Sequence, residues 1–298
     1  MRIERLTNDR IKEFIKYCEK HRIEVDESFL YDEDLKSFEV NEENPTYVIT
    51  DDQNQMIAVA SLMMDEYAKR GKKARFRIFH SEFENSEYYK QLMQAIMKHT
   101  NGLEKIFIFV PVENRALAGF IEELEFAIER YSYLLVRNDI EVPEFKVPSG
   151  YDIRPFRIGY DEEAWSLVRN ESFATLRGSE TPITPEMVTK MMSAGDSLEG
   201  GAMILYHHDR PIGVVRGADD EYEGNPIMNI GPIAIIPEYQ GKGLGRCLLR
   251  ASLQFAKKAS YERTILCVNA ENERAKSLYI QEGFVQVEAV ACYTYKLG

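Results

Sequence analysis

A glycine-rich turn between an apolar strand and an amphipathic helix constrains this sequence more than any other feature. It lies in the segment Ile233-Ala-Ile-Ile-Pro-Glu-Tyr-Gln-Gly-Lys-Gly-Leu-Gly-Arg246, which has glycine at three alternate positions. Glycines let the chain wrap closely around an anion and aim successive backbone N–H groups at it. The first N–H groups of the following helix lack internal partners, and the helix dipole favours negative charge there. We therefore predict a turn that binds a diphosphate, with Lys242 and Arg246 adding positive charge.

Two commoner nucleotide-binding motifs do not fit this turn. A P-loop requires Ser or Thr after its Gly-Lys pair, but Lys242 is followed by Gly243. The dinucleotide fingerprint places its third glycine three residues after the second, whereas Gly245 comes two residues after Gly243. The segment instead resembles the signature of the GNAT superfamily of acyl-CoA N-acyltransferases, Gln/Arg-x-x-Gly-x-Gly/Ala, with Gln240, Gly243 and Gly245 at the defined positions.

A second segment resembles the same family at the right distance downstream. The family pattern Asn-x-x-Ala-x-x-Leu-Tyr-x-x-x-Gly-Phe is filled in order by Asn272, Ala275, Leu278, Tyr279, Gly283 and Phe284. Two motifs in the expected order make chance a poor explanation of the first. The resemblance implies an α/β fold, a mixed sheet flanked by helices, with acetyl-CoA as the acyl donor and cosubstrate.

The resemblance also implies which residues contact acetyl-CoA. In the family, the strand before the turn bulges away from its neighbour, so Ile233, Ala234 and Ile235 would offer backbone groups to the pantetheine arm. The plain alternative for their side chains is core packing, and both can hold together. The remaining predicted cofactor-binding residues are Gln240, Gly241, Lys242, Gly243, Leu244, Gly245, Arg246 and Asn272. Asn272 also has the position of a helix cap.

Acyl transfer from a thioester to an amine requires two proton transfers. The amine attacks in its neutral form, although an alkylamine has a pKa of about 10.4, so a base is required. The leaving thiolate benefits from an acid. Tyr279, a phenol with a reference pKa near 10, is protonated at neutral pH, and the resemblance implies this acid role for it. The alternative is a tyrosine that only packs against the helix.

The sequence does not identify the general base. Several relatives place a glutamate in the strand before the Asn-containing helix, where this chain has Cys267, which we expect to be a small buried residue. The base would be an ordered water or a carboxylate of the acidic run Asp219, Asp220, Glu221 and Glu223. We otherwise expect that run to form a solvated turn.

An internal repeat relates the two halves of the chain. Phe126 follows Asn114 by 12 positions and Phe284 follows Asn272 by 12 positions, so the halves overlay with an offset of 158. The first copy has Ile121 in place of the tyrosine.

The first copy also lacks the diphosphate turn. Residues 81–87 stand there instead, with no glycine and three carboxylates, which would repel a diphosphate. We therefore predict two tandem GNAT-like domains: a degenerate copy without the cofactor motif at residues 1–145, and a catalytic copy at residues 146–298. Their connector is the proline-containing stretch 141–150.

Composition limits the remaining possibilities. The net charge of -12 disfavours nucleic acid and favours a cationic acceptor, a small-molecule or peptide amine. No apolar run approaches the roughly 20 residues of a membrane helix, and no secretory signal is evident, so we expect a cytoplasmic protein without a membrane partner. Four cysteines without metal-site spacing predict reduced thiols and no metal. A monomer and a homodimer both stay open.

The sequence therefore predicts an N-acetyltransferase that moves an acetyl group from acetyl-CoA to a primary amine. The alternative is a non-catalytic regulatory protein that binds acyl-CoA. Tyr279 favours the enzyme, whereas the missing glutamate weakly favours the regulator.

Overall fold

The computed structural model describes the backbone of residues 1–298 and the side chains of all of them except Glu33. The chain divides into two compact units. Unit 1 contains Met1–Ser132, Asn269–Glu271 and Glu288–Gly298, and unit 2 contains Tyr133–Val268 and Asn272–Val287. The expected boundary near residue 145 rested on the prolines of the connector. In the structure, the continuous N-terminal part of unit 1 ends at Ser132, and unit 1 also includes the C-terminal residues Glu288–Gly298.

Unit 1 has a sheet in the order β1-β2-β3-β4-β5-β12. Its strands are β1 (Arg2–Arg5), β2 (Thr46–Thr50), β3 (Met56–Met63), β4 (Lys73–Ser81), β5 (Lys105–Pro111) and most of β12 (Val285–Lys296). Adjacent strands are antiparallel except β4 and β5, which are parallel. Its helices are α1 (Ile11–His21), α2 (Asp32–Lys36), α3 (Glu66–Arg70), α4 (Ser86–Ile96) and α5 (Arg115–Glu123), with 3-10 turns η1 (Asn8–Arg10), η2 (Arg22–Glu24) and η3 (Met97–His99).

Unit 2 repeats this arrangement with the order β7-β8-β9-β10-β11-β6. Its strands are β7 (Tyr151–Pro155), β8 (Ser197–His207), β9 (Arg210–Tyr222), β10 (Asn225–Ile235), β11 (Thr264–Asn269) and part of β6 (Ala127–Arg137). The first four are antiparallel neighbours, and β10 and β11 are parallel. Its helices are α6 (Glu162–Phe173), α7 (Pro185–Met192), α8 (Leu244–Lys258) and α9 (Glu273–Gln281), with the 3-10 turn η4 (Pro237–Tyr239). The predicted α/β class with a mixed sheet is confirmed.

Corresponding helices of the two units begin at positions separated by the same 158-residue offset that relates the two halves of the sequence. Helices α4 and α8 begin at Ser86 and Leu244, 158 residues apart, and α5 and α9 begin the same distance apart. The helices α5 and α9 are capped in the same way, because Asn114 accepts from Leu117 N at 3.0 Å and Asn272 accepts from Ala275 N at 3.2 Å. The two units are therefore copies of one topology.

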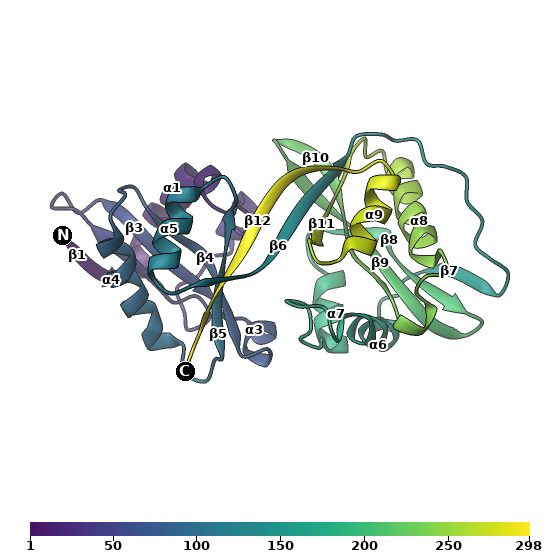
Figure 1. The fold of residues 1–298 in the computed structure, drawn as a ribbon, viewed down its shortest axis with the longest axis horizontal. Helices are drawn as coiled ribbons and strands as arrows, with labels where there is room; N and C mark the ends of the chain where they lie inside the picture. The colour runs from purple at the N-terminus through teal and green to yellow at the C-terminus, as the bar shows by residue number, and fades with distance from the viewer. The chain divides into compact units, whose positions relative to one another are not determined.

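Each sheet takes its sixth strand from the other copy. In unit 1 this strand is β12, which is antiparallel to β5 from the pair Val290↔Pro111 to the pair Lys296↔Lys105. Figure 1 shows yellow β12 beside β5, although β12 is the last strand of the chain. In unit 2 the sixth strand is β6, beside β11.

Each unit has its own hydrophobic core. In unit 2 the core collects the apolar face of α8, with Leu244, Leu248 and Leu253 buried, together with the fully buried Trp165. This packing fixes the start of α8, and hence the end of the glycine-rich turn, against the sheet.

Within the described part of the chain, no helix has the length and apolar character required to cross a membrane.

Candidate active site

Strands β10 and β11 separate soon after they meet. Among the residues that the structure describes, their pairing is limited to Met228↔Thr264 and Asn229↔Ile265. On its other edge β10 stays paired with β9 up to Ile235, after a register shift between Ile230 and Ile233. Past Asn229, the described ladder leaves the β11-facing backbone of β10 without a strand partner. Such an edge can hydrogen-bond an extended ligand that lies along it.

The residues predicted to bind the pantetheine arm lie on this separated part of β10. The side chains of Ala234 and Ile235 are buried in the core of unit 2, and Ile233 packs against that core. Their side chains therefore have a structural role, and only their backbone is suited to contact a ligand.

The turn after β10 has the backbone geometry that the glycines predict. Gly241 and Gly243 have φ of +77° and +78°, a left-handed conformation that L side chains rarely adopt. Gly243 is the N-cap residue of α8, so the unpaired N–H groups of the helix follow it directly. Among the described side chains and backbone, nothing lies within 4 Å of a Cβ built on either glycine. The space beside the turn is therefore open to an anion, and the residues present fit a diphosphate.

Gly245 differs from the other two glycines. It lies in the first turn of α8, and a Cβ there would meet Leu278 Cδ2 at 3.9 Å and Ile235 Cγ1 at 4.0 Å, which are ordinary contacts. Of the three glycines in the turn, Gly241 and Gly243 have a left-handed backbone conformation that favours glycine, and Gly245 does not.

The positive side chains near the turn have partners. Lys242 Nζ lies 4.8 Å from the centre of the Tyr239 ring, and the residue is exposed. Arg246 donates to Gln281 Oε1 at 2.5 Å and forms an ion pair with Glu282 at 3.2 Å. The charge of Arg246 is thus partly balanced, and Lys242 is the less neutralised cation of the two.

Gln240 and Leu244 hold the turn in place. Gln240 Nε2 donates to the backbone oxygen of Ile235 at 2.9 Å, which links the turn to the end of β10. Leu244 is 1% exposed and anchors the first turn of α8 in the core. Both predicted cofactor-binding residues therefore shape the turn, whatever else they contact.

Helix α9 carries the other predicted site residues. Asn272 uses its amide oxygen to cap the helix, so a cofactor contact would fall to Nδ2. Tyr279 is 8% exposed, and its ring centre lies 6.0 Å from that of Phe284. Burial raises the pKa of Tyr279 to about 12. Its phenol is therefore protonated throughout the neutral range.

Glu282, which the sequence did not single out, forms an ion pair with the predicted site residue Arg246. Its side chain is 1% exposed and accepts two hydrogen bonds from Arg250, at 2.7 and 2.8 Å, in addition to the Arg246 ion pair. Its backbone oxygen accepts from Arg137 Nε at 2.7 Å. Glu282 therefore joins α8 to the end of α9. Its partners are distant in sequence, so no local pattern indicates the contact.

Two expectations about the base require correction. Cys267 is exposed rather than buried, although it lies in β11. The acidic run lies mainly in the last part of β9 instead of a turn, since β9 extends to Tyr222 and only Glu223 of the four acids follows it.

The four carboxylates have different surroundings. Asp219 accepts from the Tyr261 hydroxyl at 2.5 Å, and Glu223 pairs with Arg263 at 3.2 Å. Glu221 is exposed.

Asp220 contacts the residue at which β10 and β11 separate. Its Oδ2 accepts from Asn229 Nδ2 at 2.8 Å, and Asn229 is the last β10 residue paired with β11. Side chains alternate between the faces of a strand, so Asp220 shares a face with Arg216, four residues earlier, and Asp219 has the opposite face. Arg216 contacts the backbone oxygen of Met191 in α7, so Asp220 lies on the α7 side of the sheet.

A family model described as the Acetyltransferase (GNAT) family matches residues 166–284. The matched range contains the separated strands, the turn and α9. Residues 166–284 of this chain therefore form a domain of the acetyltransferase (GNAT) family.

Relatives of this GNAT protein carry the name mycothiol acetyltransferase. The protein of that name from Arthrobacter sp. (strain FB24) is 25% identical over 227 residues, which cover 74% of this chain and 69% of the relative. That from Saccharomonospora viridis is 24% identical over 232 residues, covering 75% and 74%. The match to that from Pseudarthrobacter chlorophenolicus is shorter, 27% over 180 residues, and covers 54% of the relative.

Solved GNAT structures match almost the whole chain. A GCN5-related N-acetyltransferase from Sphaerobacter thermophilus superimposes with a TM-score of 0.73 at 15% identity, covering 99% of this chain and 95% of the other. A tandem GNAT protein from the clavulanic acid biosynthesis pathway gives 0.71 at 12% identity, covering 100% and 98%. The predicted GNAT fold is confirmed, as is the enzyme class, an acetyl-CoA-dependent N-acetyltransferase.

Proposed function

We propose that unit 2 is the catalytic copy and transfers an acetyl group from acetyl-CoA to the primary amine of a small molecule. The observation that carries this proposal is the early end of the β10–β11 ladder, at Asn229, followed by a turn with left-handed Gly241 and Gly243. An extended pantetheine arm beside β10, with its diphosphate at the turn, suits this arrangement. The relatives named mycothiol acetyltransferase favour a small-molecule acceptor over a protein.

The proposed reaction forms a C–N bond and breaks the C–S bond of the thioester. Tyr279 donates its hydroxyl proton to the sulfur as the C–S bond breaks. The attacking amine loses a proton to a base, and the acetylated product, an amide, is then released. The base releases its proton to solvent, and the phenolate of Tyr279 regains one from solvent, so the enzyme returns to its starting state.

We assign the base to Asp220 among the alternatives that the sequence left open. Its hydrogen bond to Asn229, the last β10 residue paired with β11, supports this assignment, because the thioester end of the donor is expected near that residue. Asp219 and Glu223 already bind Tyr261 and Arg263.

The acceptor would approach from the α6 and α7 side of the sheet. The connection after α6, which the family resemblance makes a wall of the acceptor pocket, is fixed by hydrogen bonds. Arg169 donates to Thr181 O at 2.6 Å, and Asn170 exchanges two hydrogen bonds of 2.8 Å with the backbone of Ile183. An ordered wall on the face of Asp220 is consistent with a defined small-molecule pocket.

The test compares Tyr279→Phe, Asp220→Asn and Asp219→Asn in a thiol-release assay with acetyl-CoA and a panel of amines. General acid and base groups typically contribute about 10²–10⁴-fold, so we expect Tyr279→Phe and Asp220→Asn to lower kcat at least tenfold. Asp219→Asn is the matched control and should stay within about twofold. Acetyl-CoA binding should survive in all three.

Three outcomes would contradict parts of this proposal. Full turnover by Asp220→Asn would remove the assigned base, and full turnover by Tyr279→Phe would remove the acid. A wild-type protein that binds acetyl-CoA but acetylates no amine would favour the regulatory alternative.

A further inference from the structure

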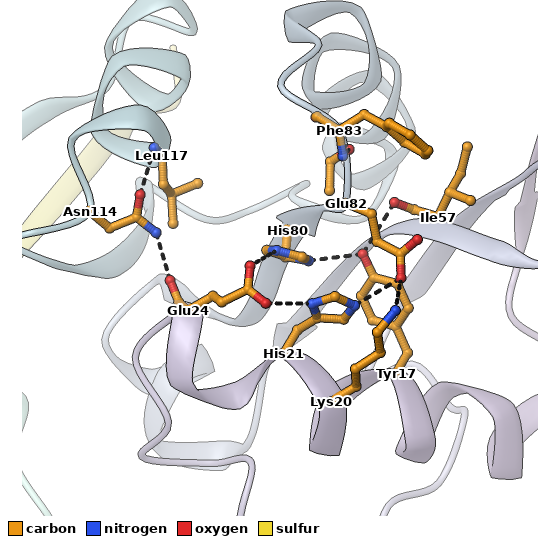
Figure 2. Close-up of polar contacts among 11 residues, drawn as sticks. Tyr17, Lys20, His21, Glu24, Ile57, His80, Glu82, Phe83, Asn114 and Leu117 are labelled. Atoms are coloured by element: carbon orange, nitrogen blue, oxygen red, sulfur yellow. Dashed lines mark hydrogen bonds and ion pairs between the residues drawn. The ribbon is translucent and has the colours of Figure 1, made fainter.

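Two histidines and two glutamates meet inside unit 1. Figure 2 shows His21, Glu24, His80 and Glu82 with their rings and carboxylates turned toward one another. His21 ends α1, Glu24 ends η2, and His80 lies in β4. The two histidine side chains are each 6% exposed, whereas that of Glu24 is 50% exposed.

Glu24 joins the two rings. Its Oε1 lies 2.8 Å from His21 Nδ1, and its Oε2 lies 3.2 Å from His80 Nε2. One ligand atom from each of these three residues can be chosen so that all lie within 4.8 Å of one another. A tetrahedral ion with bonds of about 2.0–2.1 Å requires ligand atoms roughly 3.3 Å apart, so small shifts suffice.

The other ring nitrogens already have partners of the kind that support metal-bound histidines. His21 Nε2 lies 2.9 Å from Glu82 Oε1, and His80 Nδ1 lies 2.9 Å from the Tyr17 hydroxyl, which in turn donates to Ile57 O at 3.2 Å. Metal-binding histidines generally donate their second N–H to such a carboxylate or polar oxygen, which fixes the tautomer.

A count of protons favours a cation at this place. The neutral side chains of His21, His80 and Tyr17 carry three polar hydrogens for five contacts: His21 to Glu24 and Glu82, His80 to Glu24 and Tyr17, and Tyr17 to Ile57. A metal ion bound by His21, Glu24 and His80 replaces the two contacts that involve Glu24. Three hydrogens then serve the three contacts that remain.

The charges of the neighbouring side chains agree with this count. Lys20 pairs with Glu82 at 2.6 Å and balances that carboxylate. Glu24 then supplies the negative charge that faces the two imidazole nitrogens. Because half of its side chain is exposed, an ion has an entry path and a solvent-facing position for a water ligand.

The cluster occupies an equivalent place in the repeat to the active site of unit 2. Strand β4 ends at Ser81, as β10 ends at Ile235, and each leads into a helix, α4 or α8. The N-cap residue Asn114, which corresponds to Asn272, donates to Glu24 O at 2.6 Å. Where unit 2 presents N–H groups for an anion, unit 1 presents carboxylates and imidazoles.

We propose that unit 1 binds one divalent transition-metal ion, best fitted by Zn²⁺, through His21 Nδ1, a carboxylate oxygen of Glu24 and His80 Nε2. Two histidines and one carboxylate form a recognised zinc ligand set that leaves one position open. The degenerate copy would thus have exchanged anion binding for cation binding. Cysteine spacing gave no indication of this metal site, because its ligands are histidines and a glutamate from segments up to 59 residues apart.

The test uses the full-length protein, stripped with EDTA and dialysed, then titrated with ZnCl₂ by calorimetry and with CoCl₂ by visible absorption. We expect one zinc site per chain, a visible cobalt spectrum of low coordination number, and a rise in Tm with zinc. Glu24→Gln keeps the shape of an exposed side chain, so the variant should fold, and it should weaken zinc binding at least tenfold and abolish the Tm rise.

Two matched controls address other histidines. His99→Gln removes another histidine of unit 1, and His208→Gln breaks the adjacent pair His207 and His208 in unit 2. Both variants should bind zinc as the wild type does. The proposal is overturned if the wild type binds no zinc, if Glu24→Gln binds it equally well, or if either control loses the site.

Discussion

Single residues in the turn carry different constraints even though they look alike in sequence. Gly243 has a left-handed backbone with open space around it, so its requirement for glycine is conformational. Gly245 has neither a positive φ nor a close neighbour, and a methyl group there would make ordinary contacts. The motif therefore combines a backbone requirement at one position with tolerance of a small side chain at the other.

We predict opposite effects for two alanine substitutions at these positions. Gly243→Ala should destabilise unit 2 by about 1–2 kcal/mol, because a left-handed alanine is strained. Gly245→Ala should be neutral or stabilise by up to about 1 kcal/mol, since alanine has the better helix propensity. Urea unfolding, followed by the fluorescence of the single tryptophan, Trp165 in unit 2, measures both. A Gly243→Ala protein as stable as the wild type would contradict the conformational argument.

At the scale of elements, the turn depends on how α8 and α9 are joined. Glu282, beyond the end of α9, binds two arginines of α8, and Arg137 of β6 holds its backbone oxygen. Arg137 also donates to the backbone oxygens of Asp139 and Glu141, at the start of the connector. One buried carboxylate thus connects the helix that begins at the turn with the helix that carries Tyr279.

Replacing this carboxylate should cost more than replacing an exposed one. Glu282→Gln leaves Arg250 and Arg246 without their anion, and because these arginines are 17% and 39% exposed we expect a loss of about 1–3 kcal/mol. The matched control Glu223→Gln breaks a pair whose side chains are 65% and 24% exposed, and it should cost less than about 1 kcal/mol. Thermal unfolding of the two variants measures the difference. Equal effects would mean that Glu282 contributes no more than an ordinary surface ion pair.

At the scale of the whole molecule, the sheet of each unit is completed by a strand from the other sequence repeat. Unit 1 requires residues 288–298 from the C-terminus, and unit 2 requires residues 133–137 from the end of the first copy. The buried side chains of Ala291, Cys292 and Tyr293 belong to β12, and Tyr293 donates to Glu122 of α5 at 2.9 Å. A cut between the copies in sequence order therefore leaves both sheets incomplete.

We predict that the fragment 1–145 is much less stable than the same residues in the full chain. Without β12, the edge of β5 is unpaired, which favours aggregation and rapid amide exchange. A synthetic peptide covering residues 285–298 should restore protection of β5 in hydrogen-exchange measurements, and a scrambled peptide should not. Protection of β5 in the fragment alone, equal to that in the full chain, would contradict this view of the fold.

The sequence alone predicted the features that depend on a few consecutive residues. The glycine turn, the cap residue Asn272 and the 158-residue offset follow from local conformational preferences, which act within a few residues of the chain. They were sufficient for the family, the fold class and the position of the glycine-rich turn.

Only the tertiary structure decided which distant segments meet. The sixth strand of each sheet could have come from either copy, because a repeat has the same pattern in both, and pairing with β5 or β11 depends on non-local contacts. The ion pairs of Glu282, the place of Asp220 beside Asn229 and the cluster of His21, Glu24 and His80 arise in the same way. Such contacts depend on how helices and strands pack, and spacing along the chain does not encode that packing.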